Sequence, residues 1–252
     1  MSKIALITGA TAGIGEACAR LFAQQNYNLI LLARRAERLE SLSEKLRNEF
    51  RIEVKTLVVD VRDKEAVQKL ETLPEDWKKV DVLINNAGLS RGLDPINSGD
   101  TDDWDVMIDT NVKGLLYVTK VVSSWMIKFG PGHIVNIGSI AGKETYLNGN
   151  VYCATKYAVD SLNQAMRIDL LPYKIKVTGI HPGAVETEFS EVRFKGDIER
   201  AKKVYDGFEP LHAQDIAEAI WFAVSRPAHV NINDMIVMPT AQANTTHLLR
   251  EL

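Results

Sequence analysis

The sequence predicts an α/β fold, in which a single doubly wound domain holds a parallel seven-stranded sheet with helices on both faces. Three observations predict it. Short, unbroken apolar runs recur along the 252-residue chain, and such runs are typical of strands buried on both faces of a parallel sheet. Amphipathic helical patterns alternate with these runs, as right-handed βαβ crossovers require. A glycine-rich turn joins the first apolar run to the first helical pattern.

The elements follow one another at regular intervals. The predicted strands are residues 4–7, 28–33, 54–59, 82–84, 134–137, 175–178 and 235–238, and the first three are expected to be buried. After the helix that follows the glycine-rich turn, helical patterns occupy residues 39–50, 64–73, 102–129, 150–171 and 215–225. Residues 184–211 are irregular and mixed in charge, so we expect a substrate lid there. No linker divides residues 1–252, which predicts one domain.

Composition excludes several classes of function. Apolar residues make up 46% of the chain, charged residues 25%, and the net charge is -3 without a basic tail or an acidic block. We therefore expect neither nucleic acid nor a membrane as partner, and no apolar run reaches membrane-spanning length. Cys18 and Cys153 form neither a disulfide framework nor a metal-like spacing. We predict no metal site and a reducing, cytoplasmic location.

Residues 8–15 form the glycine-rich turn, Thr-Gly-Ala-Thr-Ala-Gly-Ile-Gly. Glycine tolerates positive φ and lets backbone approach a ligand closely. The helix amino terminus beyond it offers free N–H groups, suited to a pyrophosphate. The alternative is a tight turn without a ligand.

Arg34 and Arg35 follow the second predicted strand, and the first carboxylate after them is Glu37. At this place in a Rossmann fold, an acid binds the ribose 2′-OH of NAD, whereas a cation accommodates the 2′-phosphate of NADP. Arginine also matches phosphate geometry. The pair therefore favours NADP over the alternative of solvated residues at a helix start, where acids are preferred.

Tyr152 and Lys156 lie four residues apart in a helical pattern, so their side chains share one face. A nearby positive charge lowers the pKa of a phenol from about 10, which makes the pair a proton donor and acceptor. The alternative is a half-buried tyrosine beside a solvated lysine. Ser139 follows the fifth predicted strand, where ligands bind in open α/β sheets. Asn111 lies inside a long helical pattern and indicates an irregularity there, with a solvent-facing side chain as the alternative.

Several short motifs occur together in one order along the chain. They are Thr8-Gly9-x-x-x-Gly13-Ile14-Gly15, Asn85-Asn86-Ala87-Gly88, Asn111, Ser139, Tyr152-x-x-x-Lys156 and Pro182-Gly183. The ordered set resembles the short-chain dehydrogenase/reductase family over nearly the whole chain. Residues 149–152, 187–190, 192–197 and 227–233 are similar to the NADP-dependent 3-hydroxy acid dehydrogenases of that family, which include serine and allo-threonine dehydrogenases.

The resemblance implies a role for each catalytic residue. Tyr152 would exchange a proton with the substrate oxygen, and Ser139 would hydrogen-bond the same oxygen. Lys156 would lower the pKa of Tyr152 and hold the nicotinamide ribose. Asn111 would support a water chain from Lys156 to solvent.

The resemblance also implies the cofactor site. The glycine loop would cradle the pyrophosphate, the two arginines the 2′-phosphate, residues 60–61 the adenine and residues 183–187 the nicotinamide. The implied residues are Gly9, Thr11, Ala12, Gly13, Ile14, Gly15, Arg34, Arg35, Asp60, Val61, Asn86, Ala87, Gly88, Tyr152, Lys156, Pro182, Gly183, Val185 and Thr187. Ala12 departs from the family, since many NADP-dependent relatives carry a basic residue there.

The activity implied is reversible, NADP-dependent oxidation of a 3-hydroxy acid (serine, allo-threonine or 3-hydroxypropionate type) to its 3-oxo acid. Ser139 and Tyr152 would hold the reacting oxygen. Arg193 is the candidate for the substrate carboxylate, with Lys195 second; the alternative is that both are solvated lid charges. Other functions that fit are an NADPH-dependent reductase of small aldehydes or ketones, and an NADP-binding sensor or scaffold. The family also suggests a homotetramer, in which helices 102–129 and 150–171 pack on symmetry mates or simply cover the sheet.

Overall fold

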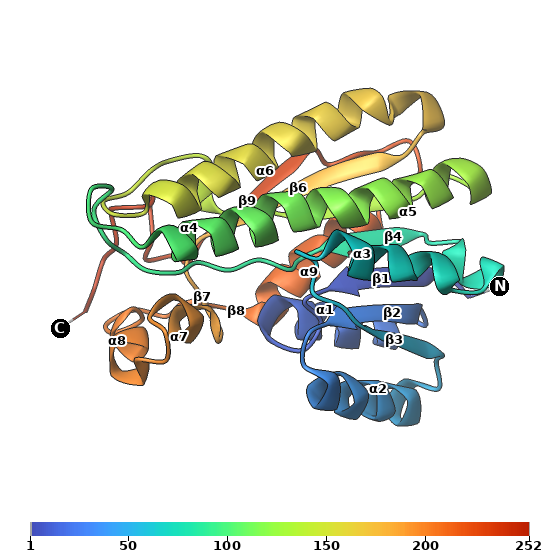
Figure 1. The fold of residues 1–252 in the computed structure, drawn as a ribbon, viewed down its shortest axis with the longest axis horizontal. Helices are drawn as coiled ribbons and strands as arrows, with labels where there is room; N and C mark the ends of the chain where they lie inside the picture. Colours follow the sequence, from blue (N-terminus) through green and yellow to red (C-terminus); the bar gives the residue numbers. More distant parts are fainter. Residues whose placement is uncertain (1, 252) are drawn as a thin grey trace.

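The computed structural model describes residues 2–251, which are organised around one seven-stranded parallel sheet (Figure 1). The strand order is β3-β2-β1-β4-β5-β6-β9, and all six neighbouring pairs are parallel. The strands are β1 Ile4–Thr8, β2 Asn28–Ala33, β3 Val54–Val58, β4 Val82–Asn85, β5 His133–Ile137, β6 Lys176–Pro182 and β9 Asp234–Val237. The α/β fold class predicted from the sequence is confirmed. The strand order reverses between β1 and β4, and this is where such sheets bind ligands.

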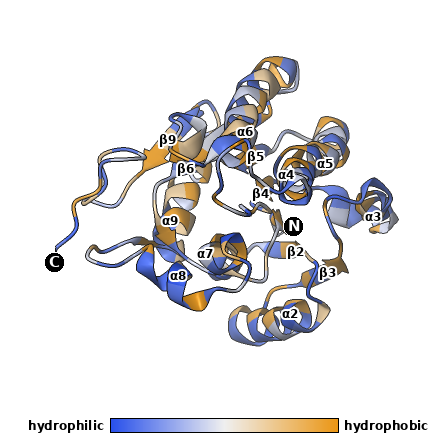
Figure 2. Cartoon of the chain, turned by 60° about the vertical axis from the view of Figure 1, so that its left-hand side comes forward, coloured by the Kyte–Doolittle hydropathy of each residue, from blue (hydrophilic) through white to orange (hydrophobic). Residues whose placement is uncertain are grey.

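Helices cover both faces of the sheet. They are α1 Gly13–Gln24, α2 Ala36–Phe50, α3 Lys64–Gln68, α4 Thr101–Ile108, α5 Leu115–Phe129, α6 Asn150–Asp169, α7 Phe189–Arg193, α8 Ile198–Lys203 and α9 Ala213–Val224. Figure 2 shows α4, α5 and α6 on one side of the strands, with α2 and α9 on the other. Alternate residues of β1 face opposite ways: Ala5 and Ile7 join the core under α1, α2 and α9, whereas Ile4 and Leu6 join the core under α5 and α6.

The edge strand β3 differs from the prediction of a buried third strand. β1 and β4 are buried at every position, but β3 is buried only at Val54, and its other residues are partly buried or exposed, as are all residues of the other edge strand, β9. Val58 in β3 is 56% exposed. An edge strand has a neighbour on one side only, so its apolar residues near the end lack cover. The prediction of a fully buried third strand was therefore wrong.

The long helical pattern 102–129 is interrupted, as the asparagine within it indicated. A π-helical turn, Asp109–Gly114, separates α4 from α5 and contains Asn111. Such turns occur frequently at functional sites. Gly114 allows the turn to approach the sheet edge, because a Cβ there would lie 2.6 Å from a methyl group of Val61.

The predicted lid, residues 184–211, is more regular than the sequence suggested. It contains α7, α8 and the short strand β7 Val185–Glu186, which pairs with β8 Leu211–His212. Asp197 starts α8 by accepting a hydrogen bond from the Arg200 amide. The prediction of an irregular segment was wrong because these helices have five and six residues, too short to show a period. Figure 1 shows α7 and α8 beyond one end of the strands. Within residues 2–251, no helix is long and apolar enough to cross a membrane.

Candidate active site

A cavity of about 320 Å³ lies at the carboxyl ends of the central strands. Its walls come from the glycine-rich turn, the ends of β2 and β5, the turn after β4, the start of α6 and the lid. Every predicted cofactor residue except Gly15 lines it, as do Ser139 and the lid residues Glu188, Phe189 and Val192. The structure thus brings together residues that are spread over most of the chain.

The glycine turn needs glycine at two positions of the cavity wall. Gly9 and Gly13 have φ values of +65° and +52°, and a Cβ on Gly13 would lie 3.0 Å from the Thr187 methyl. Gly15 instead packs beneath the turn, where a Cβ would lie 2.3 Å from the Gly9 carbonyl oxygen. Ala12 precedes α1 without a side-chain cap. The first amides of α1 therefore remain available to an anion in the cavity.

Thr8 fixes the neighbouring wall, residues 86–88. Its Oγ1 accepts hydrogen bonds from the amides of Asn86 at 3.0 Å and Ala87 at 2.9 Å. The Asn86 side chain returns a bond from Nδ2 to the Thr8 carbonyl oxygen at 2.9 Å. The two loops that border the cavity are thereby held as one unit, and Thr8 is a positioning residue whose contacts the sequence did not show.

The second-strand end carries the predicted phosphate-binding arginines. Both Arg34 and Arg35 line the cavity. The Arg35 Nη2 donates to Thr11 Oγ1 at 3.3 Å, and its Nη1 pairs with Glu188 of the lid at 2.8 Å. Across the cavity wall, burial acts to raise the pKa of the Asp60 carboxyl, but its bonds to Arg62 outweigh burial and hold that pKa low.

Tyr152 and Lys156 sit on the first turns of α6, and both are buried, 8% and 6% exposed. The Lys156 Nζ donates to the Ile137 carbonyl oxygen at 2.9 Å and lies 5.9 Å from the centre of the Tyr152 ring. Burial lowers the pKa of Lys156 to about 8. The lysine thus lies beside the phenol, held by the end of β5.

The pKa of Tyr152 is nevertheless raised. Burial is the largest cause, and the Arg193 charge and the Ser139 hydroxyl act in the opposite direction. Lys156 lies 5.9 Å from the ring centre, and burial lowers its own pKa to about 8. That Lys156 makes this phenol more acidic stays a prediction. The cation that opposes the rise is Arg193.

Asn111 lies behind the cavity wall and does not line it. Its side chain bonds both backbone groups of Leu89: Oδ1 accepts from the Leu89 amide and Nδ2 donates to the Leu89 carbonyl oxygen, both at 2.8 Å. It also donates to Thr155 Oγ1 at 3.0 Å. A Cβ added at Gly88 would meet both Asn111 Oδ1 at 3.3 Å and Lys156 Nζ at 3.5 Å. Asn111 therefore joins the loop after β4 to α6 next to the lysine; the predicted water chain stays a prediction.

Arg193, at the end of α7, is placed against Tyr152. Its guanidinium carbon lies 5.2 Å from the centre of the Tyr152 ring, 5.8 Å from Tyr146 and 5.1 Å from Phe189. The Nη2 donates to the Tyr146 hydroxyl at 2.9 Å. Among the described residues, its buried Nε has no hydrogen-bond partner. Lys195 points elsewhere, since its Nζ pairs with Asp103 at 2.8 Å.

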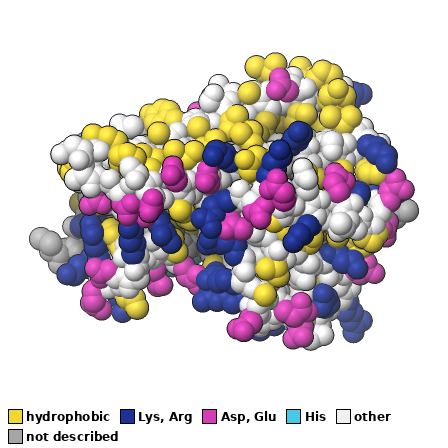
Figure 3. All heavy atoms as spheres, in the orientation of Figure 1, with side chains coloured by type: hydrophobic (Ala, Val, Ile, Leu, Met, Phe, Trp, Pro, Cys, Tyr) yellow, Lys and Arg dark blue, Asp and Glu magenta, His cyan; other side chains and the backbone are white. Residues whose placement is uncertain are grey.

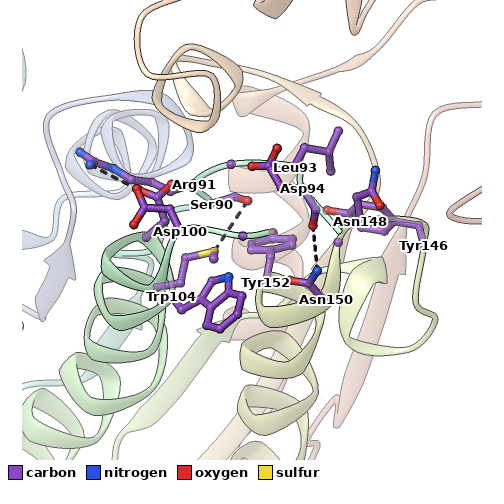
Figure 4. Close-up of a pocket in the computed structure, with 15 residues that line it drawn as sticks. Ser90, Arg91, Leu93, Asp94, Asp100, Trp104, Tyr146, Asn148, Asn150 and Tyr152 are labelled. Carbon is purple, nitrogen blue, oxygen red and sulfur yellow. Dashed lines mark hydrogen bonds and ion pairs between the residues drawn. The ribbon is translucent and has the colours of Figure 1, made fainter. Parts of the chain in front are cut away.

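A second, smaller cavity of about 10 Å³ has Tyr152 in its wall (Figure 4). Loop residues 90–94, α4 and residues 146–150 complete it, and Asn150 Nδ2 donates to the Asp94 carbonyl oxygen at 2.9 Å. Its volume corresponds to about one water molecule. Trp104 and Tyr146 line it together with Tyr152.

A family model described as short chain dehydrogenase matches residues 3–197. The chain belongs to the short-chain dehydrogenase family. Among its relatives is an NADP-dependent 3-hydroxy acid dehydrogenase of Salmonella typhi, 46% identical over 95% of this chain and 96% of the relative. A sulfoacetaldehyde reductase of Chromohalobacter salexigens is also 46% identical, over 96% of both chains.

Two solved structures of this family are similar over almost their full length. The closed form of a serine dehydrogenase complexed with NADP⁺ has a TM-score of 0.91 and 43% identity, covering 99% of this chain and 100% of the other. A serine dehydrogenase from Escherichia coli has a TM-score of 0.81 and 40% identity, covering 95% and 99%. The predicted resemblance to the short-chain dehydrogenases, and to their hydroxy acid and serine dehydrogenases, is confirmed.

Sequence reasoning missed the aromatic surroundings of Arg193. Tyr146 and Phe189 come from a loop and a five-residue helix, so neither belongs to a periodic pattern. Glu188, which pairs with Arg35 from the lid, was missed for the same reason. The one available signal was the segment 187–190, because it begins with Thr187, which the resemblance assigns to the nicotinamide.

Proposed function

We propose that this protein is an NADP-dependent oxidoreductase that interconverts a 3-hydroxy acid and its 3-oxo acid. The observation that carries the proposal is the position of Arg193, whose guanidinium carbon lies 5.2 Å from the centre of the Tyr152 ring. Its buried Nε has no hydrogen-bond partner among residues 2–251, although the side chain lines neither of the two cavities beside Tyr152. A substrate whose hydroxyl reaches Tyr152 then has its anionic group within reach of a planar, multidentate cation. The names of the relatives support the same substrate class.

The proton chemistry falls to Tyr152. In the oxidation direction its phenolate takes the proton of the substrate hydroxyl, and in reduction the phenol returns a proton to the carbonyl oxygen. Ser139, which acts on the pKa of Tyr152, lies where it can hydrogen-bond the same oxygen and orient the reacting carbon. NADP supplies the hydride acceptor or, when reduced, the hydride donor. Lys156, whose pKa is about 8, can accept and release the proton near neutral pH.

The cavity fits NADP on its own chemistry. The uncapped start of α1 and the glycines at positive φ suit a pyrophosphate. Arg34 and Arg35, which follow β2, suit the 2′-phosphate of NADP, and neither of these two positions carries the acid that binds the ribose 2′-OH of NAD. We therefore assign the adenosine end to residues 34–35 and 60–61, and the nicotinamide end to residues 183–187.

Steady-state kinetics test the proposal. Oxidation of serine, allo-threonine and 3-hydroxypropionate is measured with NADP and with NAD, and we expect turnover with a strong preference for NADP. A strong preference for NAD would overturn the assignment of the arginine pair. Turnover of uncharged alcohols alone would overturn the assignment of the substrate class.

A second candidate is a reductase of other small aldehydes or ketones, including sulfonated ones. A relative of equal identity is named a sulfoacetaldehyde reductase. A sulfonate presents anionic oxygens to Arg193 as a carboxylate does. Parallel assays with carboxylated, sulfonated and uncharged carbonyl compounds separate the two candidates by kcat/KM. A cofactor-binding sensor, by contrast, needs no proton carrier, so loss of turnover in Tyr152→Phe would exclude it.

We also propose a homotetramer in the cytoplasm. Figure 3 shows hydrophobic side chains gathered over α5 and α6. On these helices, Ile127 is 43% exposed and Ile168 is 73% exposed. Apolar surface of this kind marks interaction sites on soluble proteins. Sedimentation of the purified protein tests the assembly, and a monomer at micromolar concentration would contradict it.

A further inference from the structure

The lid places a carboxylate against Arg35 of the expected 2′-phosphate site and against the neighbouring Arg38. Glu188 Oε2 lies 2.8 Å from Arg35 Nη1, and its Oε1 lies 2.5 Å from Arg38 Nη1. Arg35 also reaches back to Thr11 in the glycine-rich turn, at 3.3 Å. One acidic side chain from residue 188 therefore occupies both arginines, 153 and 150 positions away in the sequence.

We propose that Glu188 is a specificity-determining residue of the cofactor site, because its carboxylate competes with the 2′-phosphate of NADP for Arg35. The proposal rests on the NADP function proposed above. It goes further in assigning to the lid a residue that limits the preference for NADP over NAD.

The charges of Glu188 and of the 2′-phosphate explain why the two groups compete for Arg35. A phosphate monoester carries about −1.5 to −2 at pH 7 and three strong acceptor oxygens. Burial acts to raise the pKa of Glu188, but its bonds to Arg35 and Arg38 outweigh burial and keep the carboxyl ionised at neutral pH. A 2′-phosphate on Arg35 thus meets a second anion held by the same guanidinium. NAD carries only a hydroxyl at this position, so Glu188 opposes the two cofactors unequally.

Glu188 is free to exchange partners. It precedes α7 and makes no side-chain cap to that helix. The side chains of Arg35, Arg38 and Glu188 are 43%, 52% and 40% exposed. Water therefore screens both pairs, and exposed pairs of this kind are weak. The competition is accordingly expected to change affinity severalfold, not by orders of magnitude.

The experiment measures nucleotide binding by calorimetry, without substrate. Glu188→Gln is compared with the wild type and with Glu191→Gln, an exposed acid of the same helix. The ligands are NADPH, NADH, 2′,5′-ADP and 5′-AMP. We expect Glu188→Gln to bind NADPH and 2′,5′-ADP between about twofold and tenfold more tightly. NADH and 5′-AMP binding should be unchanged, and Glu191→Gln should match the wild type.

Two further readouts sharpen the result. The gain for 2′,5′-ADP should shrink when salt is raised from about 0.05 M to 0.5 M, because exposed charges are screened. Glu188→Asp keeps the charge but shortens the reach to both arginines, so its affinity should lie between those of the wild type and Glu188→Gln. Melting temperatures confirm that each variant is folded.

Three outcomes would overturn the proposal. NADPH binding that is unchanged or weaker in Glu188→Gln would show that Glu188 does not compete. An equal gain for NADH and 5′-AMP would show that the effect does not involve the 2′-phosphate. A wild-type protein that binds NADH as tightly as NADPH would remove the cofactor assignment itself, which is distinguishable from failure of the Glu188 proposal alone.

Discussion

Replacing Arg193 with methionine removes the proposed carboxylate ligand while keeping its aromatic contacts. Methionine fills the same space against the rings of Tyr146, Tyr152 and Phe189, which surround the guanidinium at 5.1 to 5.8 Å. A hydrogen bond to a charged group contributes about 1.5–3 kcal/mol. One arginine nitrogen is already bonded to Tyr146, and the Nε is free. We therefore expect a loss of about 2–3 kcal/mol, or about 30- to 150-fold in kcat/KM.

The assay compares 3-hydroxypropionate with its methyl ester, which has the same carbon skeleton without the charge. Saturating NADP is used, and rates are measured from about pH 7 to pH 11. The range of pH matters because Arg193 also holds down the pKa of Tyr152. In the variant that pKa rises, so less phenolate is present at neutral pH and oxidation of both substrates falls there. The acid and the ester share this loss, so the ratio of their kcat/KM values at each pH isolates the carboxylate-specific loss.

Lys195→Met is the matched control, since Lys195 pairs with Asp103 and Asp100 instead of facing Tyr152. It should leave the ratio of acid to ester near that of the wild type. Equal losses for acid and ester in Arg193→Met at high pH would refute the carboxylate role. A selective loss in Lys195→Met would assign that role to the other lid cation.

Three further changes test the rest of the site. Tyr152→Phe should lower turnover by about 10²- to 10⁴-fold, while NADPH binding, measured by fluorescence, is retained. Turnover near that of the wild type would exclude Tyr152 as the proton carrier. Asn111→Ala should lower the free energy of unfolding, measured by urea titration, by about 1–3 kcal/mol, because the backbone amide and carbonyl of Leu89 lose their hydrogen-bond partner. An unchanged urea midpoint would show that these two bonds do not stabilise the fold. The pKa of Lys156 is about 8 in the folded protein, whereas the ordinary value for a lysine, expected in the unfolded chain, is 10.5. Between these two pH values the unfolded chain therefore binds more protons than the folded protein does. The free energy of unfolding of the wild type should therefore rise with pH across this window relative to Lys156→Met, by up to about 3 kcal/mol, and parallel pH curves would refute the shifted pKa.

The sequence was sufficient for what depends on local pattern and strand order. Apolar runs located all seven strands of the sheet to within a few residues, because strands of a sheet that is covered by helices on both faces are mostly apolar. Asn111 marked the π-helical turn, because a side chain that competes for backbone bonds is costly in a regular helix. Strand ends then placed Arg34, Ser139 and the turn at residues 86–88 around one cavity.

Contacts between distant segments were not predictable in the same way. The pairing of Glu188 with Arg35 joins residues 153 positions apart, and the local sequence around either residue does not indicate its partner. The clamp of Leu89 by Asn111 depends on the π-helical turn facing the loop after β4. The burial of the edge strand β3 was overestimated, because the sequence alone does not show which strands lie at the edge of the sheet. Short lid helices likewise lack the length for a helical period to emerge.

Two cations from different parts of the molecule lie beside Tyr152. Lys156 is anchored to β5 within the sheet-bound core, whereas Arg193 belongs to α7 of the lid. Arg193 is the cation that opposes the effect of burial on the pKa of the phenol, together with the Ser139 hydroxyl. Because the same guanidinium is the proposed ligand of the substrate anion, movement of α7 would change substrate binding and proton transfer together. Lid substitutions that leave both tyrosine and lysine intact should consequently shift the alkaline limb of the pH profile, a result that a purely steric lid would not give.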